Sequence, residues 1–239
     1  MSEVVVKPTA EAVAAEAAER LVQAAQAAVA RRGRFRVALA GGNTPMALYR
    51  LLVAEPYRQR MPWPQAEVFW GDERHLPPGD PGRNDTAVLP LLAEAGVPPA
   101  QIHPAPYIPD NPDASARAYE VALRRGWDAG EPLLDAALLG LGTDGHTASL
   151  FPGTPALEET ARLVVANRAA YEDRHPERIT LTLPALAETG LILFLVTGAA
   201  KREAVRRALA GPEDPPLPAQ RVRSRFGPVV WLLDEAAAP

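Results

Sequence analysis

An acid and an imidazole lie close together in the glycine-rich stretch 140–153, whose sequence is GLGTDGHTASLFPG. Asp144 and His146 are separated by a single glycine, and the stretch follows directly on the apolar run 133–139. An imidazole is well suited to accept a proton near neutral pH, and a neighbouring acid can fix its tautomer and orientation. The spacing therefore predicts that His146 is a general base, oriented by Asp144 or by a backbone group.

The same stretch has the spacing of a dinucleotide-binding loop, with glycines at 140, 142 and 145. That motif requires a helix to begin at the loop and an acid to follow at the end of the next strand. Pro152, Gly153 and Pro155 would interrupt such a helix within about two turns. The next expected strand ends near residue 168, which is an arginine. The sequence therefore does not favour a nucleotide site.

A metal site is the second alternative, since Asp144 and His146 could ligate an ion together with His75 or Asp72. The other two of the four histidines lie in segments without a motif around them. We therefore expect no metal.

A glycine turn earlier in the chain, GGNTP at 41–45, is a candidate phosphate site. It follows an apolar run, and Thr44 and Pro45 suit the N-cap and the first position of a helix. Backbone amides and the helix dipole favour an anion at such a turn, although an ordinary strand-to-helix connection explains the same residues. The candidate phosphate ligands here are Gly41, Gly42, Asn43 and Thr44.

Lys201 lies in a second turn of this kind, VTGAAK, at the expected start of a helix. Lys7 is the only other lysine in a chain that otherwise uses arginine. A cation in the first helical turn opposes the helix dipole, and a phosphate in front of it would resolve that conflict. Lys201 is therefore a candidate phosphate ligand, with a solvated surface lysine as the alternative.

Three charged residues, Asp72, Glu73 and Arg74, follow the apolar run 66–70. Because the carboxyl ends of parallel strands meet at one edge of a sheet, we expect this triplet to lie beside the other loops. We expect it to combine an ion pair between the glutamate and the arginine with one ligand contact.

Composition narrows the class of protein. The 239 residues carry a net charge of −4 and a pI near 5.7, which gives no overall attraction to nucleic acid or to an acidic membrane. No cysteine is present, so disulfides, thiolate metal sites and a cysteine nucleophile are excluded. No apolar run has membrane-spanning length and no signal peptide is recognisable. We therefore expect one cytoplasmic domain over residues 1–239, without nucleic-acid or membrane partners.

Segments of helix and strand character alternate along the chain. Residues 9–32 have apolar positions at helical spacing, with Thr9 as N-cap and Gly33 as stop. Helices are also expected at 45–52, 84–95, 112–127 and 199–210, and strands at 35–40, 66–70, 133–139, 162–167, 178–183, 191–196 and 229–233. This alternation predicts a three-layer α/β domain whose parallel strands deliver the loops at their carboxyl ends.

Five motifs together resemble the 6-phosphogluconolactonase family, in order and spacing across nearly the whole chain. They are GGNTP at 41–45, GDER at 71–74, GLGTDGHTASLFP at 140–152, RIT at 178–180 and GAAK at 198–201. The third motif is highly specific, and the others are weak singly. The resemblance implies an open, mostly parallel, Rossmann-like αβα sheet of the glucosamine-6-phosphate deaminase type, and no cofactor. It also implies hydrolysis of 6-phospho-D-glucono-1,5-lactone to 6-phospho-D-gluconate in the pentose phosphate pathway.

A lactone is an activated ester, so a neutral imidazole that deprotonates water is sufficient for its hydrolysis. On this interpretation His146 is the base, Asp144 orients it, and Arg74 with the glycine-rich backbone positions the substrate or its oxyanion. The residues expected to bind the sugar and its 6-phosphate are Gly41, Gly42, Asn43, Thr44, Asp72, Gly145, Arg178 and Lys201. Arg178 has a nearly equal alternative as a surface charge at a strand end. The expected partner is a small phosphorylated sugar lactone, bound by a monomer or a small homo-oligomer.

The chain departs from the family pattern at two positions. Asn43 stands where the family usually has serine, and Arg83-Asn84 stands where it has Ser-Asn. Asparagine still donates and accepts hydrogen bonds, and Arg83 could add a phosphate contact.

Two other functions fit the same fold. An amino-sugar-phosphate isomerase or deaminase has a glutamate five residues after the histidine, where this chain has Phe151, which cannot carry a proton. A non-catalytic sugar-phosphate-binding module, as found in transcription regulators of this architecture, would need a DNA-binding segment. The alanine-rich first helix has no helix-turn-helix partner, and the chain is acidic. We therefore expect the lactonase.

Overall fold

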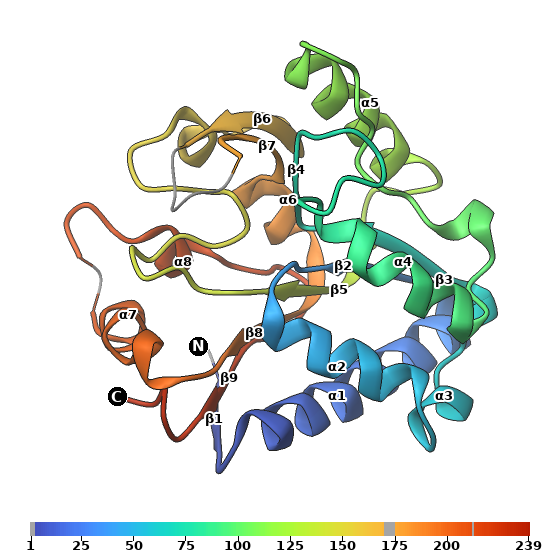
Figure 1. The fold of residues 1–239 in the computed structure, drawn as a ribbon, viewed down its shortest axis with the longest axis horizontal. Coiled ribbons are helices and arrows are strands. Elements are labelled where there is room, and N and C mark those ends of the chain that lie inside the picture. Colours follow the sequence, from blue (N-terminus) through green and yellow to red (C-terminus); the bar gives the residue numbers. More distant parts are fainter. Residues whose placement is uncertain (1–2, 170–174, 212) are drawn as a thin grey trace.

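The computed structural model describes residues 3–169, 175–211 and 213–239 (Figure 1). Its main sheet has six strands in the order β1-β9-β8-β5-β2-β3, and every neighbouring pair is parallel. The strands are β1 (Glu3–Lys7), β2 (Phe35–Leu39), β3 (Ala66–Trp70), β5 (Leu134–Leu139), β8 (Thr189–Val196) and β9 (Val229–Asp234). The expected open parallel sheet is confirmed.

Helices cover both faces of this sheet, which gives the expected three layers (Figure 1). On one face lie α1 (Ala10–Arg32), α2 (Asn43–Val53), α3 (Tyr57–Arg60) and α4 (Asn84–Ala95). On the other lie α5 (Pro112–Arg124), α6 (Leu183–Ala187), α7 (Arg202–Leu209) and α8 (Pro218–Arg221). Short 3-10 helices are η1 (Trp63–Gln65), η2 (Pro99–Gln101), η3 (Pro155–Glu158) and η4 (Ala199–Lys201). Within the described part of the chain, no helix is long and apolar enough to cross a membrane.

The caps of α1 are the predicted ones. The Thr9 side chain accepts a hydrogen bond from the backbone N–H of Ala12, and Gly33 ends the helix with a φ of 71°. A left-handed residue at this position is typical of helix C-termini and favours glycine.

The central strands are buried on both sides, which explains their unbroken apolar sequence. All six residues of β5 are buried. Ala136 and Leu138 pack with the α1 and α2 layer, whereas Ala137 and Leu139 pack with the α5 layer. Successive side chains of a strand point to opposite faces, so a strand between two helical layers needs apolar residues throughout.

A second, antiparallel sheet stands beside the main one at the top of Figure 1. Its strands, in the order β4-β7-β6, are β4 (Asp72–Arg74), β7 (Glu177–Leu181) and β6 (Val164–Arg168). The expected strands near 162–167 and 178–183 therefore exist, but they lie outside the parallel sheet. The charged triplet at 72–74 is itself a strand, because it pairs with β7. The edge strand β1 was not predicted.

Candidate active site

A cavity of about 460 Å³ opens at the carboxyl edge of the main sheet. Its walls come from the segments that follow β2 and β3 and from the ends of β5 and β8. The chain leaves β2 toward β3 on one side and leaves β5 toward β8 on the other, so the strand order reverses between β2 and β5. Open α/β sheets bind ligands at such a switch point. Among the predicted site residues, the cavity brings together Gly41, Gly42, Asn43, Thr44, Asp72, Arg74, His146 and Lys201.

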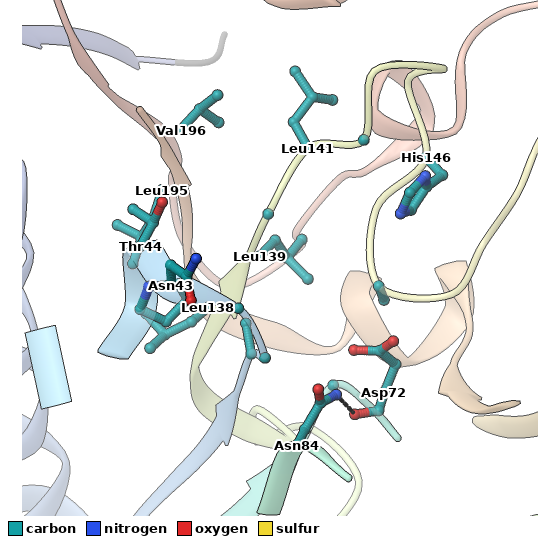
Figure 2. Close-up of a pocket in the computed structure, with 18 of the residues that line it drawn as sticks. Asn43, Thr44, Asp72, Asn84, Leu138, Leu139, Leu141, His146, Leu195 and Val196 are labelled. Carbon is teal, nitrogen blue, oxygen red and sulfur yellow. Dashed lines mark hydrogen bonds between the residues drawn. The ribbon is translucent and has the colours of Figure 1, made fainter. Parts of the chain in front are cut away.

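The two predicted halves of the site face each other across this cavity. Figure 2 shows His146 on one side and Asn43 and Thr44 on the other, with Asp72 and Asn84 at one end between them. A ligand that fills the cavity would contact both sides at once.

His146 and Asp144 form a hydrogen-bonded pair. Nδ1 of His146 lies 2.6 Å from Oδ1 of Asp144, which also accepts the backbone N–H of His146 at 3.1 Å. Burial raises the pKa of Asp144, but the hydrogen bonds and charge of His146 outweigh burial and lower that pKa below its ordinary value. An ionised Asp144 accepts the Nδ1 proton, so Nε2 is the nitrogen left to act as a base. The His146 side chain lines the cavity and is 14% exposed.

The imidazole of His146 is fixed by close contacts with its own loop. A Cβ added at Gly142 would lie 2.0 Å from Nδ1 of His146, so only a glycine allows the ring to approach this closely. The ring of the buried Phe151 packs against the imidazole, with centroids 4.3 Å apart. The loop is closed by the Gly142 N–H, which donates to the carbonyl of His146, and by the Thr147 hydroxyl, which donates to the carbonyl of Gly140.

The opposite wall is the turn before α2. Here Gly42, with a φ of 103°, is the N-cap, and Asn43 is the first helical residue. The predictions that Thr44 caps the helix and that Pro45 occupies its first position are therefore wrong by two residues. When no side chain caps a helix, the first backbone N–H groups have no intrahelical hydrogen-bond partner. They can then donate to an anion bound at the helix start.

Lys201 lines the same cavity from a neighbouring turn. It is the last residue of η4, directly before α7, rather than part of an α-helical first turn. The two turns are joined by their hydroxyls, since Thr44 Oγ1 lies 2.9 Å from Thr197 Oγ1. Lys201 and the start of α2 therefore line the same part of the cavity.

The charged triplet contributes Asp72 and Arg74 to the cavity. Asp72 accepts a hydrogen bond from the Ser149 hydroxyl at 2.6 Å, and Arg74 donates to the carbonyl of Gly82. The expected partner of Glu73 was Arg74, but the arginine beside its carboxylate is Arg83, at 4.0 Å.

Arg83 makes several structural contacts and lines a second cavity rather than the one that His146 lines, so its phosphate contact stays a prediction. Its side chain is 2% exposed. It donates to the Asp85 carboxylate at 2.5 Å and to the carbonyls of Leu76 and Ala105. These contacts tie the start of α4 to two loops.

Two predicted ligands, Arg178 and Gly145, do not appear among the described residues that line the cavity. Arg178 is 2% exposed on β7, so its alternative as a surface charge is wrong. Gly145 has a φ of 87°, and a Cβ there would meet the Leu217 side chain. Their roles in ligand binding stay predictions.

Asn84 and Thr197 line the cavity but were not predicted as site residues. Asn84 belongs to a family motif that this chain alters at Arg83, and Thr197 precedes the glycine of the second turn. A second cavity of about 430 Å³ shares Arg74, Asn84 and residues 40–43 with the first. Among the described residues, no group of three or more acidic or histidine side chains could hold a metal ion.

The fold and site define an α/β protein in which His146, hydrogen-bonded to Asp144, and the glycine-capped start of α2 line one switch-point cavity. The family described as glucosamine-6-phosphate isomerases/6-phosphogluconolactonase matches residues 8–231. The 6-phosphogluconolactonase of Synechocystis is 41% identical over 88% of this chain and 86% of that protein, and that of Mycobacterium tuberculosis is 38% identical over 99% and 97%. The chain belongs to this family.

Solved structures agree with this placement. The 6-phosphogluconolactonase of Trypanosoma cruzi has a TM-score of 0.87 at 25% identity, covering 99% of this chain and 96% of that one. A monomeric glucosamine-6-phosphate deaminase, at 21% identity and a TM-score of 0.84, shares the fold.

Proposed function

We propose that this protein hydrolyses 6-phospho-D-glucono-1,5-lactone to 6-phospho-D-gluconate. The observation that carries the proposal is that His146, paired with Asp144, lines the same cavity as Lys201 and the start of α2. Curated relatives at 38–41% identity over most of the chain bear the name of this enzyme. The substrate has an acyl carbon and a phosphate at opposite ends, which matches the two walls of the cavity.

In this proposal Nε2 of His146 removes a proton from a water molecule while the water oxygen attacks the lactone carbonyl carbon. The tetrahedral oxyanion then collapses, the bond from carbon to the ring oxygen breaks, and the imidazolium returns its proton to that oxygen. The net reaction adds one water molecule across the ester bond of the lactone. Asp144 stabilises the imidazolium between these steps and holds the ring with Nε2 toward the substrate.

The other wall binds the 6-phosphate. The backbone of Gly42, Asn43 and Thr44 at the start of α2 offers amides and a helix dipole to the anion, and Lys201 adds a full positive charge. Asp72 and Arg74 lie between the two ends and contact the sugar or the oxyanion. Gly41, Gly145 and Arg178 complete the proposed set of binding residues.

The isomerase or deaminase alternative is less well supported. Phe151 stands at the position of the glutamate in that pattern, and its ring packs behind His146 at 6% exposure. An aromatic side chain cannot move a proton between sugar atoms. The relatives with the highest identities above are lactonases, and the deaminase of known structure shares the fold alone.

The test is a direct assay with 6-phosphogluconolactone. Because the lactone also opens spontaneously, the rate must be compared with a protein-free control and with the His146→Ala variant. Catalytic amounts of protein should accelerate hydrolysis well above both. A wild-type rate equal to the spontaneous one would refute the function.

Some features of the proposal remain predictions. They are a single catalytic domain over residues 1–239, a monomer or small homo-oligomer, a cytoplasmic location and the lack of nucleic-acid partners.

A further inference from the structure

Glu73 is a buried carboxylate beside the cavity. Its side chain is 1% exposed, and it accepts hydrogen bonds from three backbone N–H groups. Oε1 accepts those of Arg74 at 2.8 Å and Asn84 at 2.6 Å, and Oε2 accepts that of Asp85 at 2.9 Å. Asn84 and Asp85 are the first two residues of α4, so Glu73 joins strand β4 to the start of that helix.

The groups held by Glu73 form one wall of the cavity. Arg74 and Asn84 both line it. The Asn84 amide donates to the carbonyl of Asp72 at 2.8 Å, and a Cβ added at Gly41 would lie 1.9 Å from Asn84 Oδ1. By fixing the backbone of Asn84, Glu73 also fixes the position of the Asn84 side chain. That side chain contacts both the strand that carries Asp72 and the turn that precedes α2.

We propose that Glu73 is a positioning residue for substrate binding, acting through Asn84 on the wall formed by Gly41, Asp72 and Arg74. This inference rests on the proposed function. The pair Asp144 and His146 belongs to the loop after β5, and that loop meets this wall where Ser149 donates to Asp72. None of the three hydrogen bonds to Glu73 comes from that loop, so their loss should raise KM more than it lowers kcat.

The electrostatic surroundings make this contact sensitive to pH. Burial, together with the charge of Asp85, raises the pKa of Glu73 to about 7, although the backbone hydrogen bonds from Asn84 and Asp85 and the charge of Arg83 oppose this rise. The charged and titratable groups facing Glu73 are Arg83 and Asp85 at the start of α4 and Tyr119 on α5. Protonation converts one carboxylate oxygen of Glu73 into a hydroxyl group. The protonated side chain then accepts hydrogen bonds from the three backbone N–H groups less well than the carboxylate does. Substrate binding should therefore weaken as the pH falls through this range.

The first experiment is the Glu73→Gln variant, which keeps the shape but replaces one acceptor oxygen with a donor. At pH 8 we expect KM for the lactone to rise about tenfold or more while kcat changes less than about threefold. Glu177→Gln, which removes an ion-paired carboxylate from the adjacent strand β7, is the matched control and should keep both constants. A folded Glu73→Gln protein with unchanged KM, or with kcat reduced and KM unchanged, would overturn the inference.

The second experiment uses the unmodified protein, so it does not depend on the variant folding. Inorganic sulfate keeps its charge across this pH range, and as a competitive inhibitor it probes the anion site. Histidines gain positive charge on acidification, which by itself would tighten sulfate binding. We expect the opposite, a Ki that rises as the pH falls from 8 to 6 at constant ionic strength. A Ki that is constant or falls would overturn the inference, whereas a chain without lactonase activity would refute the function itself.

Discussion

The imidazole of His146 lies so close to the backbone of Gly142 that a Cβ at position 142 would be 2.0 Å from its Nδ1. The same Cβ would be 2.5 Å from Oδ1 of Asp144. Gly142→Ala should therefore displace both members of the pair, and a displacement of about 1 Å can cost on the order of 10²-fold in rate. Steady-state kinetics should show this loss in kcat with KM little changed. Gly211→Ala is the control, since a Cβ there meets nothing within 4 Å. Equal kcat values for the two variants would contradict the close approach.

His146→Ala removes the proposed base but leaves the phosphate wall intact. We expect kcat to fall by about 10²–10⁴-fold with a modest change in KM, because general-base catalysis contributes factors of this size. The measurement must subtract the spontaneous opening of the lactone. Turnover close to that of the wild type would remove His146 from this role.

Asp144→Asn keeps the size of the side chain but loses its charge. The variant no longer stabilises an imidazolium, and its amide can donate to Nδ1, which would leave the proton on Nε2. We expect kcat to fall by at least about 10²-fold while the protein remains folded. Circular dichroism would check the fold, and an unchanged kcat would show that the 2.6 Å contact has no catalytic role.

Lys201→Ala tests the phosphate assignment. A lost charge–phosphate contact should raise KM for the phosphorylated lactone by about 10-fold or more, since hydrogen bonds to charged groups contribute about 1.5–3 kcal/mol. Activity on unphosphorylated gluconolactone, where measurable, is the internal control and should change far less. An equal loss on both substrates would mean that Lys201 does not bind the phosphate.

Arg83→Ala tests the structural role of the arginine that the sequence suggested as a phosphate ligand. The substitution leaves the carboxylates of Asp85 and Glu73 buried without their cation. Breaking a buried pair in this way costs about 3–5 kcal/mol, which urea denaturation would detect as a lower midpoint. Arg206→Ala, which breaks an exposed pair with Glu203, should leave the midpoint unchanged. Similar midpoints for both variants would argue against a structural role.

The parallel strands could be predicted because a strand buried on both faces is apolar throughout, as in residues 133–139. The loop residues Asp144 and His146 could be found because their motif is contiguous. Contacts between segments that are distant in the sequence could not be predicted in this way. Whether a short strand such as β7 joins the main sheet or a separate one depends on the path of the chain, which local pattern does not encode.

The errors near the cavity have the same origin. The carboxylate of Glu73 lies beside Arg83 rather than Arg74 because the first turn of α4 packs against strand β4, which places Arg83 next to Glu73. The start of α2 was placed two residues late because Gly42 caps it without a side-chain hydrogen bond. Glycine at an N-cap carries little sequence signal compared with threonine.

The packing of Phe151 against His146 bears on how this scaffold diverged in evolution. A carboxylate at position 151, as in the isomerases, would here enter a site that is 6% exposed and occupied by ring–ring contact. An isolated buried charge is unfavourable unless new partners accompany it. Evolution from one activity to the other therefore requires, besides that substitution, further changes that give the new carboxylate a hydrogen-bonding or charged partner.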